Sequence, residues 1–205
     1  MTKKALVWIR EDLRIENNSS LAYASQKHEM VSAVYIYNKK NFDKTREAQK
    51  WWLSKSLNSF KESLKKFNIN LEIAQGDEVD FFLKIKKKDD ISIYWNKIYE
   101  PNIINKGKKI RDHFINNEIN YKYFKGNILI EFQEVTKDDG TPFKVFTPFW
   151  KNAEQKYLNK TPSKILKIKK LNKIYNLLEN SSNIEIILPK KNWYKKFEKY
   201  WNPSE

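Results

Sequence analysis

The chain has 205 residues, with 40 basic and 25 acidic side chains, no cysteine and two histidines, which excludes disulfide scaffolds, thiolate metal sites and multi-histidine metal sites. Hydrophobic residues make up 40% and aromatic residues 15%, enough for a folded core. No apolar run approaches the roughly 20 residues that span a bilayer, and the N-terminus lacks a signal-peptide core. We therefore expect a cytoplasmic protein without a metal or a membrane partner.

The first half of the chain alternates between strand and helix patterns. Residues 5–9 form a short apolar run typical of a strand buried on both faces. A short helix is expected over residues 21–27, with Ser19 and Ser20 as possible caps. A second apolar run covers residues 31–37 and predicts the next strand.

The alternation continues through residue 124. The three-and-four spacing of apolar residues predicts a long helix over residues 46–67. Asp77 can cap a further helix that carries Val79 and Phe82. The remaining predicted elements are strands at 71–74, 91–95 and, more weakly, 121–124, and a helix at 102–117. This order predicts an α/β fold: a Rossmann-like five-stranded parallel sheet with helices on both faces.

The pattern changes after the fifth predicted strand. Thr147 and Pro148 suit the start of a helix that runs through Tyr157. Residues 161–205 are lysine-rich and contain three prolines, which indicates a linker or wrapping segment. We expect an α/β domain over 1–135, a loop and interdomain helix over 136–160, and an irregular linker over 161–205.

Ligands of such sheets bind at the carboxyl ends of the strands. The loop of residues 10–14 there is either a salt-bridged turn or a functional loop. Residues 95–102 combine aromatic, amide and carboxylate groups that suit a planar heteroaromatic ligand, although Trp95 and Tyr99 can equally be core and Asn102 a helix cap. No glycine-rich phosphate loop and no catalytic constellation is present in the sequence.

Two aromatic segments have more than one interpretation. Trp51 and Trp52 lie about 100° apart on a helix, so one is expected in the core and the other against a ligand, a partner or solvent. The segment 142–150 is either a hairpin packed on the sheet or a docking surface for another domain.

The net charge of +15 also has two interpretations. It can indicate a nucleic-acid partner, or it can reflect an AT-rich genome. Only four basic residues are arginine, the residue that bidentate phosphate and base recognition favours. The charge alone is therefore weak support for a nucleic-acid-binding module, which stays one hypothesis.

Several segments, in order along the chain, resemble the DNA photolyase/cryptochrome family. The opening stretch Leu6–Arg14 is similar to the start of that family, and Trp51-Trp52-Leu53 to its long-helix signature. Tyr94-Trp95-Asn96 with Tyr99-Glu100-Pro101 resembles the loop after its fourth strand. The strongest match is Phe143–Lys151, and Trp201–Glu205 is similar to the linker before the family's second domain.

The resemblance implies an N-terminal domain that holds a light-harvesting antenna chromophore. In complete family members a C-terminal helical domain follows, binds FAD and docks UV-damaged DNA, and its reduced FAD splits cyclobutane pyrimidine dimers. The chain ends where that domain should begin, so the expected function is the antenna domain of a deoxyribodipyrimidine photolyase, inactive in repair alone. FAD and damaged DNA are expected only through the missing or separate helical domain, and no catalytic residue is assigned.

The resemblance also implies where the antenna chromophore binds. The chromophore is expected to be of the methenyltetrahydrofolate or 8-hydroxy-deazaflavin type, but Ile103 and Ile104 depart from the patterns of both. The alternative is a free-standing, cryptochrome-like module that binds a chromophore or nucleotide and works with a separate flavin subunit. The residues expected to line the pocket are Asn38, Arg46, Lys50, Trp95, Asn96, Glu100, Asn102 and Lys106.

Overall fold

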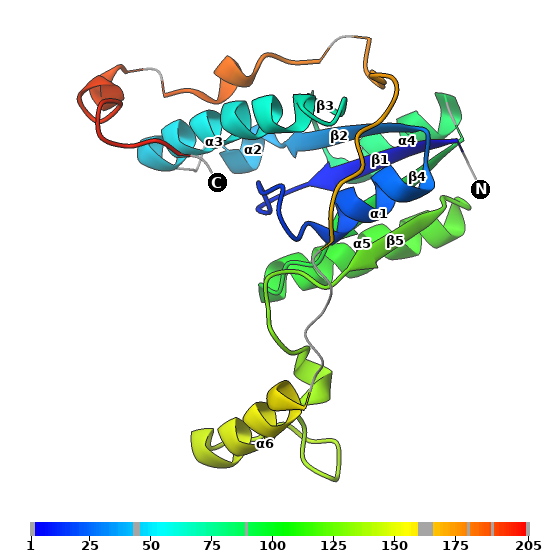
Figure 1. Cartoon of the computed structure of the whole chain (residues 1–205), viewed down its shortest axis with the longest axis vertical. Coiled ribbons are helices and arrows are strands. Elements are labelled where there is room, and N and C mark those ends of the chain that lie inside the picture. The colour runs from blue at the N-terminus through cyan, green and yellow to red at the C-terminus, as the bar shows by residue number, and fades with distance from the viewer. Residues whose placement is uncertain are drawn as a thin grey trace.

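A computed structural model describes residues 3–42, 46–88, 90–159, 166–179, 181–189 and 191–203. Its centre is one sheet of five parallel strands in the order β3-β2-β1-β4-β5 (Figure 1). The strands are β1 (Lys4–Ile9), β2 (Met30–Tyr37), β3 (Asn70–Gln75), β4 (Ile91–Asn96) and β5 (Tyr121–Phe124). The predicted five-stranded parallel sheet is confirmed.

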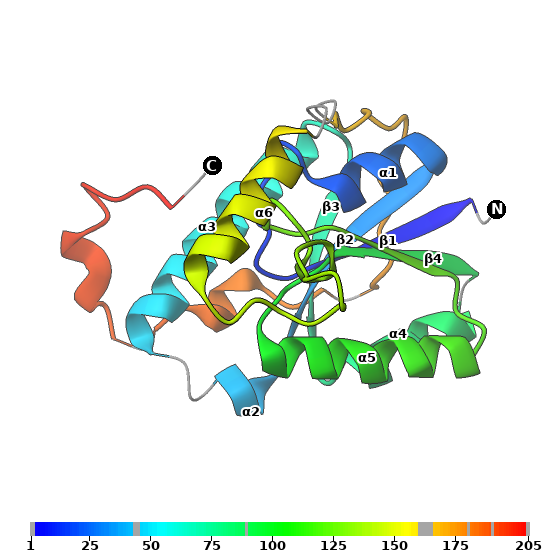
Figure 2. The same cartoon turned by 90° about the horizontal axis from the view of Figure 1, so that it is seen from below.

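The described helices are α1 (Ser19–Lys27), α2 (Lys39–Phe42), α3 (Glu47–Lys65), α4 (Glu78–Lys88), α5 (Pro101–Asn116) and α6 (Phe146–Leu158). The part of the chain that the structure describes also contains three short 3₁₀ turns, Phe132–Glu134, Ile184–Ile187 and Trp193–Lys196. Helices α1 and α3 cover one face of the sheet, and α4 and α5 cover the other (Figure 2).

Alternation along the central strand builds the two halves of the core. Val7 and Ile9 of β1 pack with α1 and α3, whereas Leu6 and Trp8 pack with α4 and α5. All four side chains are buried, because a parallel sheet with helices on both faces leaves its central strand no exposed side. This accounts for the continuous apolar run that predicted the strand.

Two predicted helix starts were wrong. The cap of α1 is Asn18, whose side chain accepts a hydrogen bond from the backbone N–H of Leu21, while Ser19 and Ser20 lie inside the helix. Helix α6 begins at Phe146 after an extended Val145, so Thr147 does not cap it. The predicted cap Asp77 is confirmed, since its carboxylate accepts from the N–H of Val79 at 2.8 Å.

The segment of residues 166–189, here called the strap, wraps back onto the domain (Figure 1, orange). Ile168, Leu171, Ile184 and Ile187 of the strap are buried in the core beside α1 and α3. Of the linker or wrapping segment expected over 161–205, the part that forms the strap therefore wraps onto the domain, and its role as an interdomain linker stays a prediction.

The strap also covers the outer edge of β3. The backbone oxygen of Ile73 accepts from the N–H of Ser182, and the N–H of Ile73 donates to the hydroxyl of Ser181, both at 2.9 Å. Such contacts occupy backbone groups that an edge strand would otherwise present to another chain.

Helix α6 stands away from the sheet (Figure 1). Its aromatic side chains Phe146, Phe149 and Trp150 are exposed, and Ala153 is its buried residue. The interpretation of 142–150 as a hairpin packed on the sheet was wrong, and the docking surface stays a prediction.

Candidate functional site

The site lies at the carboxyl ends of β1 and β4 and begins with the loop of residues 10–14. Asp12 fixes this loop, because its carboxylate accepts from the backbone N–H of Arg10 at 3.1 Å. The other carboxylate oxygen accepts from the side-chain amide of Asn96, at the end of β4, at 2.6 Å. The loop is therefore held against the neighbouring strand by a charge-assisted hydrogen bond.

Two buried asparagines join this loop to α1. The amide nitrogen of Asn96 donates to Oδ1 of Asn18 at 2.9 Å, and its oxygen accepts from the N–H of Ser20 at 3.1 Å. The amide nitrogen of Asn18 donates to the backbone oxygen of Arg14 at 3.0 Å. Both side chains are buried and their polar atoms are bonded, as buried amides require, so they position three elements at one point.

Next to this junction is a cavity of about 930 Å³, here called the main cavity. One wall is a face of α3, along which Ser56, Ser59 and Ser63 provide small side chains beside Trp52 and Leu53. Drug-sized ligands occupy pockets of about 300–1,000 Å³ that are mostly apolar with a few polar groups. The lining residues are Arg10, Glu11, Asp12, Leu13, Arg14, Tyr35, Ala48, Gln49, Trp52, Leu53, Ser56, Ser59, Phe60, Ser63, Asn96, Lys97, Ile98, Gly126 and Asn127.

Arg10 supplies a partly buried cation to this cavity. Its guanidinium lies 4.7 Å from the ring centre of Trp8 and donates to the backbone oxygen of Asn96. Burial lowers the pKa of Arg10, against the opposing effect of Asp12. Arg10 and Arg14 both line the cavity, and within the described part of the chain their buried Nε atoms have no hydrogen-bond partner.

Two further titratable groups line the main cavity. Burial raises the pKa of Tyr35 to about 12, with the carboxylates of Glu11 and Glu78 acting in the same direction. The phenol is therefore neutral at physiological pH and keeps its proton for donation. Burial also raises the pKa of Glu11, and the nearby carboxylate of Glu100 adds to that effect.

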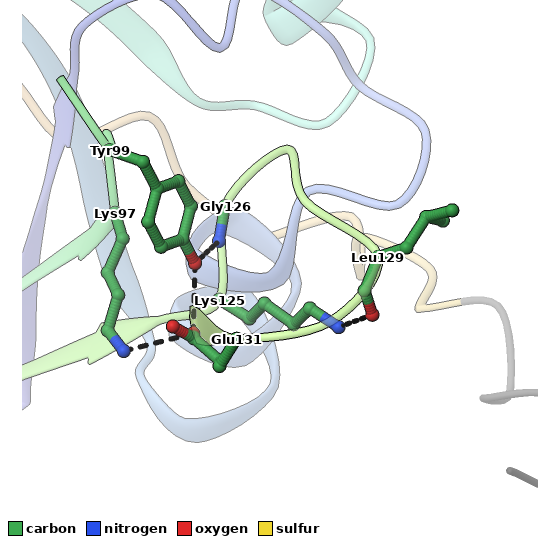
Figure 3. Close-up of polar contacts among 6 residues, drawn as sticks. All are labelled: Lys97, Tyr99, Lys125, Gly126, Leu129 and Glu131. Carbon is green, nitrogen blue, oxygen red and sulfur yellow. Dashed lines mark hydrogen bonds and ion pairs between the residues drawn. The ribbon is translucent and has the colours of Figure 1, made fainter. Parts of the chain in front are cut away.

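The loop of residues 125–131 completes the wall and is fastened to the end of β4 (Figure 3). The hydroxyl of Tyr99 donates to the carboxylate of Glu131 at 2.9 Å and accepts from the N–H of Gly126 at 3.1 Å. Lys97 pairs with the same carboxylate at 3.0 Å, and Lys125 donates to the backbone oxygen of Leu129. Burial raises the pKa of Tyr99 to about 12, with Glu131 contributing, so the phenol stays protonated.

Gly126 is required by this close approach. A Cβ atom at that position would lie 2.0 Å from the backbone oxygen of Lys97, a separation that only a shift of the backbone can relieve. The glycine therefore lets the loop lie directly against the end of β4.

A smaller cavity of about 210 Å³ lies beside the main one and shares Arg10, Lys97 and Ile98 with it. Trp95 reaches this smaller cavity but is itself only 3% exposed and stacks on Tyr121 with ring centres 5.5 Å apart. Of the two interpretations of Trp95, the contacts favour a core residue.

The structure brings few of the eight predicted pocket residues together. Asn96 lines the main cavity and Trp95 the smaller one. Asn38 follows β2, and Arg46 precedes α3 with its N–H bonded to Gln49 at 3.2 Å. These placements leave the assignment of a ligand to the eight residues a prediction.

The other four predicted residues lie on or beside helices. Lys50 pairs with Glu47 at 3.0 Å. Glu100 precedes α5 and is exposed, as is Asn102 in its first turn. Lys106 pairs with Glu78 of α4 at 2.6 Å and therefore faces α4.

Sequence reasoning missed the serine face of α3 and the glycine of the 125–131 loop. Ser56, Ser59 and Ser63 recur at the helical spacing next to the apolar stripe, a signal that was present in the sequence. The role of Gly126 depends on a contact with Lys97, which no local pattern indicates. Trp51 and Trp52 do face different ways, as predicted: Trp51 is buried, and Trp52 is 43% exposed and lines the main cavity.

The described residues provide neither a metal-binding cluster nor a membrane-spanning helix. Among them, no group of three or more histidine, cysteine, aspartate or glutamate side chains is arranged to hold a metal ion. No helix in the same part of the chain is long and apolar enough to cross a membrane.

The fold and the site define a doubly covered α/β domain with a ligand-sized cavity at the carboxyl edge of its sheet. The sequence profile described as DNA photolyase matches residues 5–167. The chain belongs to the DNA photolyase family, whose members similar to this chain include cryptochromes.

Individual relatives agree with this membership. The chain is 29% identical over 205 residues to a deoxyribodipyrimidine photo-lyase of Agrobacterium fabrum, covering 100% of this chain and 43% of that protein. It is 29% identical over 158 residues to cryptochrome-2 of Arabidopsis thaliana, covering 75% of this chain and 26% of that protein. A class III photolyase structure from Agrobacterium tumefaciens superposes with a TM-score of 0.83 at 27% identity, covering 99% of this chain and 42% of that one. The chain thus spans less than half the length of these relatives.

Proposed function

We propose that this chain is the N-terminal antenna-chromophore domain of a deoxyribodipyrimidine photolyase, and that the main cavity holds the chromophore. The observation that carries the proposal is the position of that cavity, which lies at the carboxyl ends of β1 and β4 within a domain of this family. Ligands of open α/β sheets bind at this edge. The proposed chromophore is a methenyltetrahydrofolate or an 8-hydroxy-deazaflavin.

The lining supports a planar ligand with polar groups on its rim. Trp52, Leu53 and Phe60 offer an apolar wall, and the serines of α3 leave room beside it. The guanidinium groups of Arg10 and Arg14, which both line the cavity, can donate to a ring carbonyl or an acidic group of the ligand. Aromatic and apolar contacts with a few donors fit both proposed chromophores and do not separate them.

The residues of this chain bind and orient the ligand. Asp12 and Asn96 hold the arginine loop in place, and the guanidinium of Arg10 is itself held by the backbone oxygen of Asn96 and the ring of Trp8 before the ligand arrives. The neutral phenol of Tyr35 lines the same cavity and can donate a proton in a hydrogen bond. When bound, the chromophore supplies light absorption and passes its excitation energy to a flavin held elsewhere.

The rest of the repair activity belongs to a C-terminal helical domain that binds FAD and UV-damaged DNA. Two features support such a partner: the chain spans less than half of its relatives, and α6 exposes Phe146, Phe149 and Trp150. The DNA-repair activity of the isolated chain is therefore expected to be absent. Light-dependent repair of dimer-containing DNA by these 205 residues alone would contradict this part of the proposal.

A cryptochrome-like photoreceptor module is the second candidate. The 29% identity to a plant cryptochrome over 158 residues favours it, although the photolyase match at the same identity extends over all 205 residues. The two candidates share the chromophore cavity and differ in whether the assembled protein repairs dimers.

A titration of the purified chain tests the chromophore site. Methenyltetrahydrofolate and 8-hydroxy-deazaflavin are added separately, and binding is followed by the change in chromophore absorbance and fluorescence. One of the two is expected to bind with one-to-one stoichiometry. Binding of neither would contradict the proposal.

A variant that fills the cavity shows where the ligand binds. Ser59→Phe places a large side chain in the main cavity and is expected to weaken binding at least about tenfold, which corresponds to roughly 1.4 kcal/mol. Asn58→Phe adds the same side chain to the exposed side of the same helix and is the matched control. Equal binding by both variants would place the ligand outside the main cavity.

A further inference from the structure

A second cleft lies at the opposite end of the strands, between the end of α1 and the strap. Its volume is about 400 Å³. Lys27 ends α1 and Met30 begins β2, so the cleft is at the amino edge of the sheet, away from the main cavity. The residues that line it are Gln26, Lys27, His28, Glu29, Met30, Lys169, Lys170, Leu171, Asn172 and Lys173.

The strap presents its lysines to this cleft from a fixed backbone. The N–H of Lys169 donates to the hydroxyl of Ser25 at 3.0 Å, and the N–H of Leu171 donates to the backbone oxygen of Phe67 at 3.0 Å. Ile168 and Leu171 are buried in the core. With these two side chains turned inward, the lysines at 169, 170 and 173 remain exposed beside the cleft.

The charge of the cleft is strongly unbalanced. Four lysines line it against one carboxylate, that of Glu29. Among the described residues, the ion pairs involve other lysines, such as Lys65 with Glu62 and Lys55 with Glu198, and none involves these four. The four ammonium groups therefore add their fields at one place rather than neutralising nearby carboxylates.

Stabilisation of α1 accounts for only one of these lysines. Lys27 lies in the last turn of α1, where a cation favours the helix dipole. Lys169, Lys170 and Lys173 lie on irregular backbone of the strap, so this explanation does not apply to them.

We propose that this cleft binds the phosphodiester backbone of nucleic acid, independently of base sequence. Lysine is a compact point charge that pairs with phosphate without the bidentate geometry that base recognition needs. A row of lysines on a fixed strap releases condensed counterions when it meets a phosphate backbone. The site is separate from the main cavity and does not depend on the chromophore assignment.

Binding of a fluorescently labelled, undamaged DNA duplex to the purified chain tests the proposal. Fluorescence anisotropy is measured over a series of salt concentrations for the wild type and for the triple variant Lys169→Ala, Lys170→Ala, Lys173→Ala. We expect the variant to bind at least about tenfold more weakly. The slope of log K against log salt concentration should also be smaller in magnitude for the variant, by roughly one for each phosphate that it no longer neutralises.

A control variant loses the same number of lysines from the other face of the sheet, which α4 and α5 cover. Lys84→Ala, Lys108→Ala, Lys109→Ala changes three exposed lysines of α4 and α5 and is expected to keep most of the affinity and slope. Circular dichroism confirms that both variants are folded. Equal losses in the two variants would show a diffuse charge effect and overturn the proposal, as would wild-type binding too weak to detect at low salt. Binding of inorganic pyrophosphate without any binding of the duplex would also overturn it.

Discussion

Asn96 shapes the site by holding its neighbours in place, because its side-chain amide is bonded to protein groups. Its amide joins Asp12, Asn18 and the N–H of Ser20, three groups from the loop and the helix that surround the main cavity. Its side chain is only 4% exposed. A buried polar group of this kind is costly to remove because its former partners lose their hydrogen bonds.

Replacing this residue tests its positioning role. Asn96→Ala leaves the N–H of Ser20 without a partner and removes a donor from the carboxylate of Asp12, so it is expected to lower the free energy of unfolding by about 1–3 kcal/mol. Urea denaturation followed by circular dichroism measures this change. Asn102→Ala changes an exposed residue of α5 and should stay within about 0.5 kcal/mol of wild type. Equal effects of the two substitutions would refute the role assigned to Asn96.

Two glycines are expected to respond in opposite ways to the same substitution. Gly126→Ala sets a methyl group against the backbone oxygen of Lys97 and should destabilise the fold by roughly 1–3 kcal/mol. Gly107→Ala lies inside α5, where the new methyl group meets only the side chain of Arg111 at 3.6 Å. It should stabilise the fold by about 0.5–1 kcal/mol, because alanine favours a helix interior. Melting temperatures of the two variants that move in the same direction would contradict this comparison.

At the scale of elements, the strap depends on a buried carboxylate in β3. Glu72 is 1% exposed and accepts from the backbone N–H groups of Leu177 and Leu178 at 2.7 and 2.5 Å. The hydroxyl of Ser32 donates to the same carboxylate. Two backbone N–H groups of the strap, about a hundred residues away in sequence, therefore donate to one side chain of the sheet.

Removing the negative charge should release the strap locally. In Glu72→Gln the amide nitrogen cannot accept a hydrogen bond, so one of the two strap N–H groups loses its partner. Hydrogen exchange measured by NMR is expected to show faster exchange at Leu177, Leu178 and Ser182, with β1 and β4 unchanged. Uniformly faster exchange across the sheet would indicate global destabilisation and would contradict the claim that Glu72 holds only the strap.

The elements differ in how far the sequence predicts them. The strands and α3 follow from apolar runs and periodicity, because burial on both faces of a parallel sheet leaves a direct pattern in the chain. The path of the strap does not, since its anchor Glu72 is a lone carboxylate in a strand and its partners lie far away in sequence. The predicted start of α6 was wrong because threonine favours the N-cap position, whereas the helix begins at Phe146 and both Thr147 and Pro148 lie inside its first turn.

The candidate site was predicted less completely than the fold. The carboxyl edge of the sheet was expected from topology, and the main cavity lies there. Which side chains line the main cavity depends on the packing of α3 and of the loop 125–131, and this packing leaves no local pattern in the sequence. The assignment of the eight predicted residues to a ligand stays a prediction. Asn96 alone among them lines the main cavity.

At the scale of the whole molecule, the two ends of the sheet carry different surfaces. The carboxyl edge carries the main cavity with two lining arginines, Arg10 and Arg14, and the amino edge carries the lysine cleft of the strap. Strands of six residues separate the two by about 20 Å at roughly 3.3 Å per residue, so both can be occupied at once. Chromophore binding and duplex binding are accordingly expected to be independent of each other.

The most direct test of the central claim is a crystal structure of this chain with the chromophore that binds in the titration. The account predicts electron density for a planar ligand between the loop of residues 10–14, the serine face of α3 and the end of β4, with a polar group of the ligand within hydrogen-bonding distance of Arg10 or Arg14. A ligand bound instead between Asn38, Lys50 and Asn102, with the main cavity filled only by solvent, would contradict it.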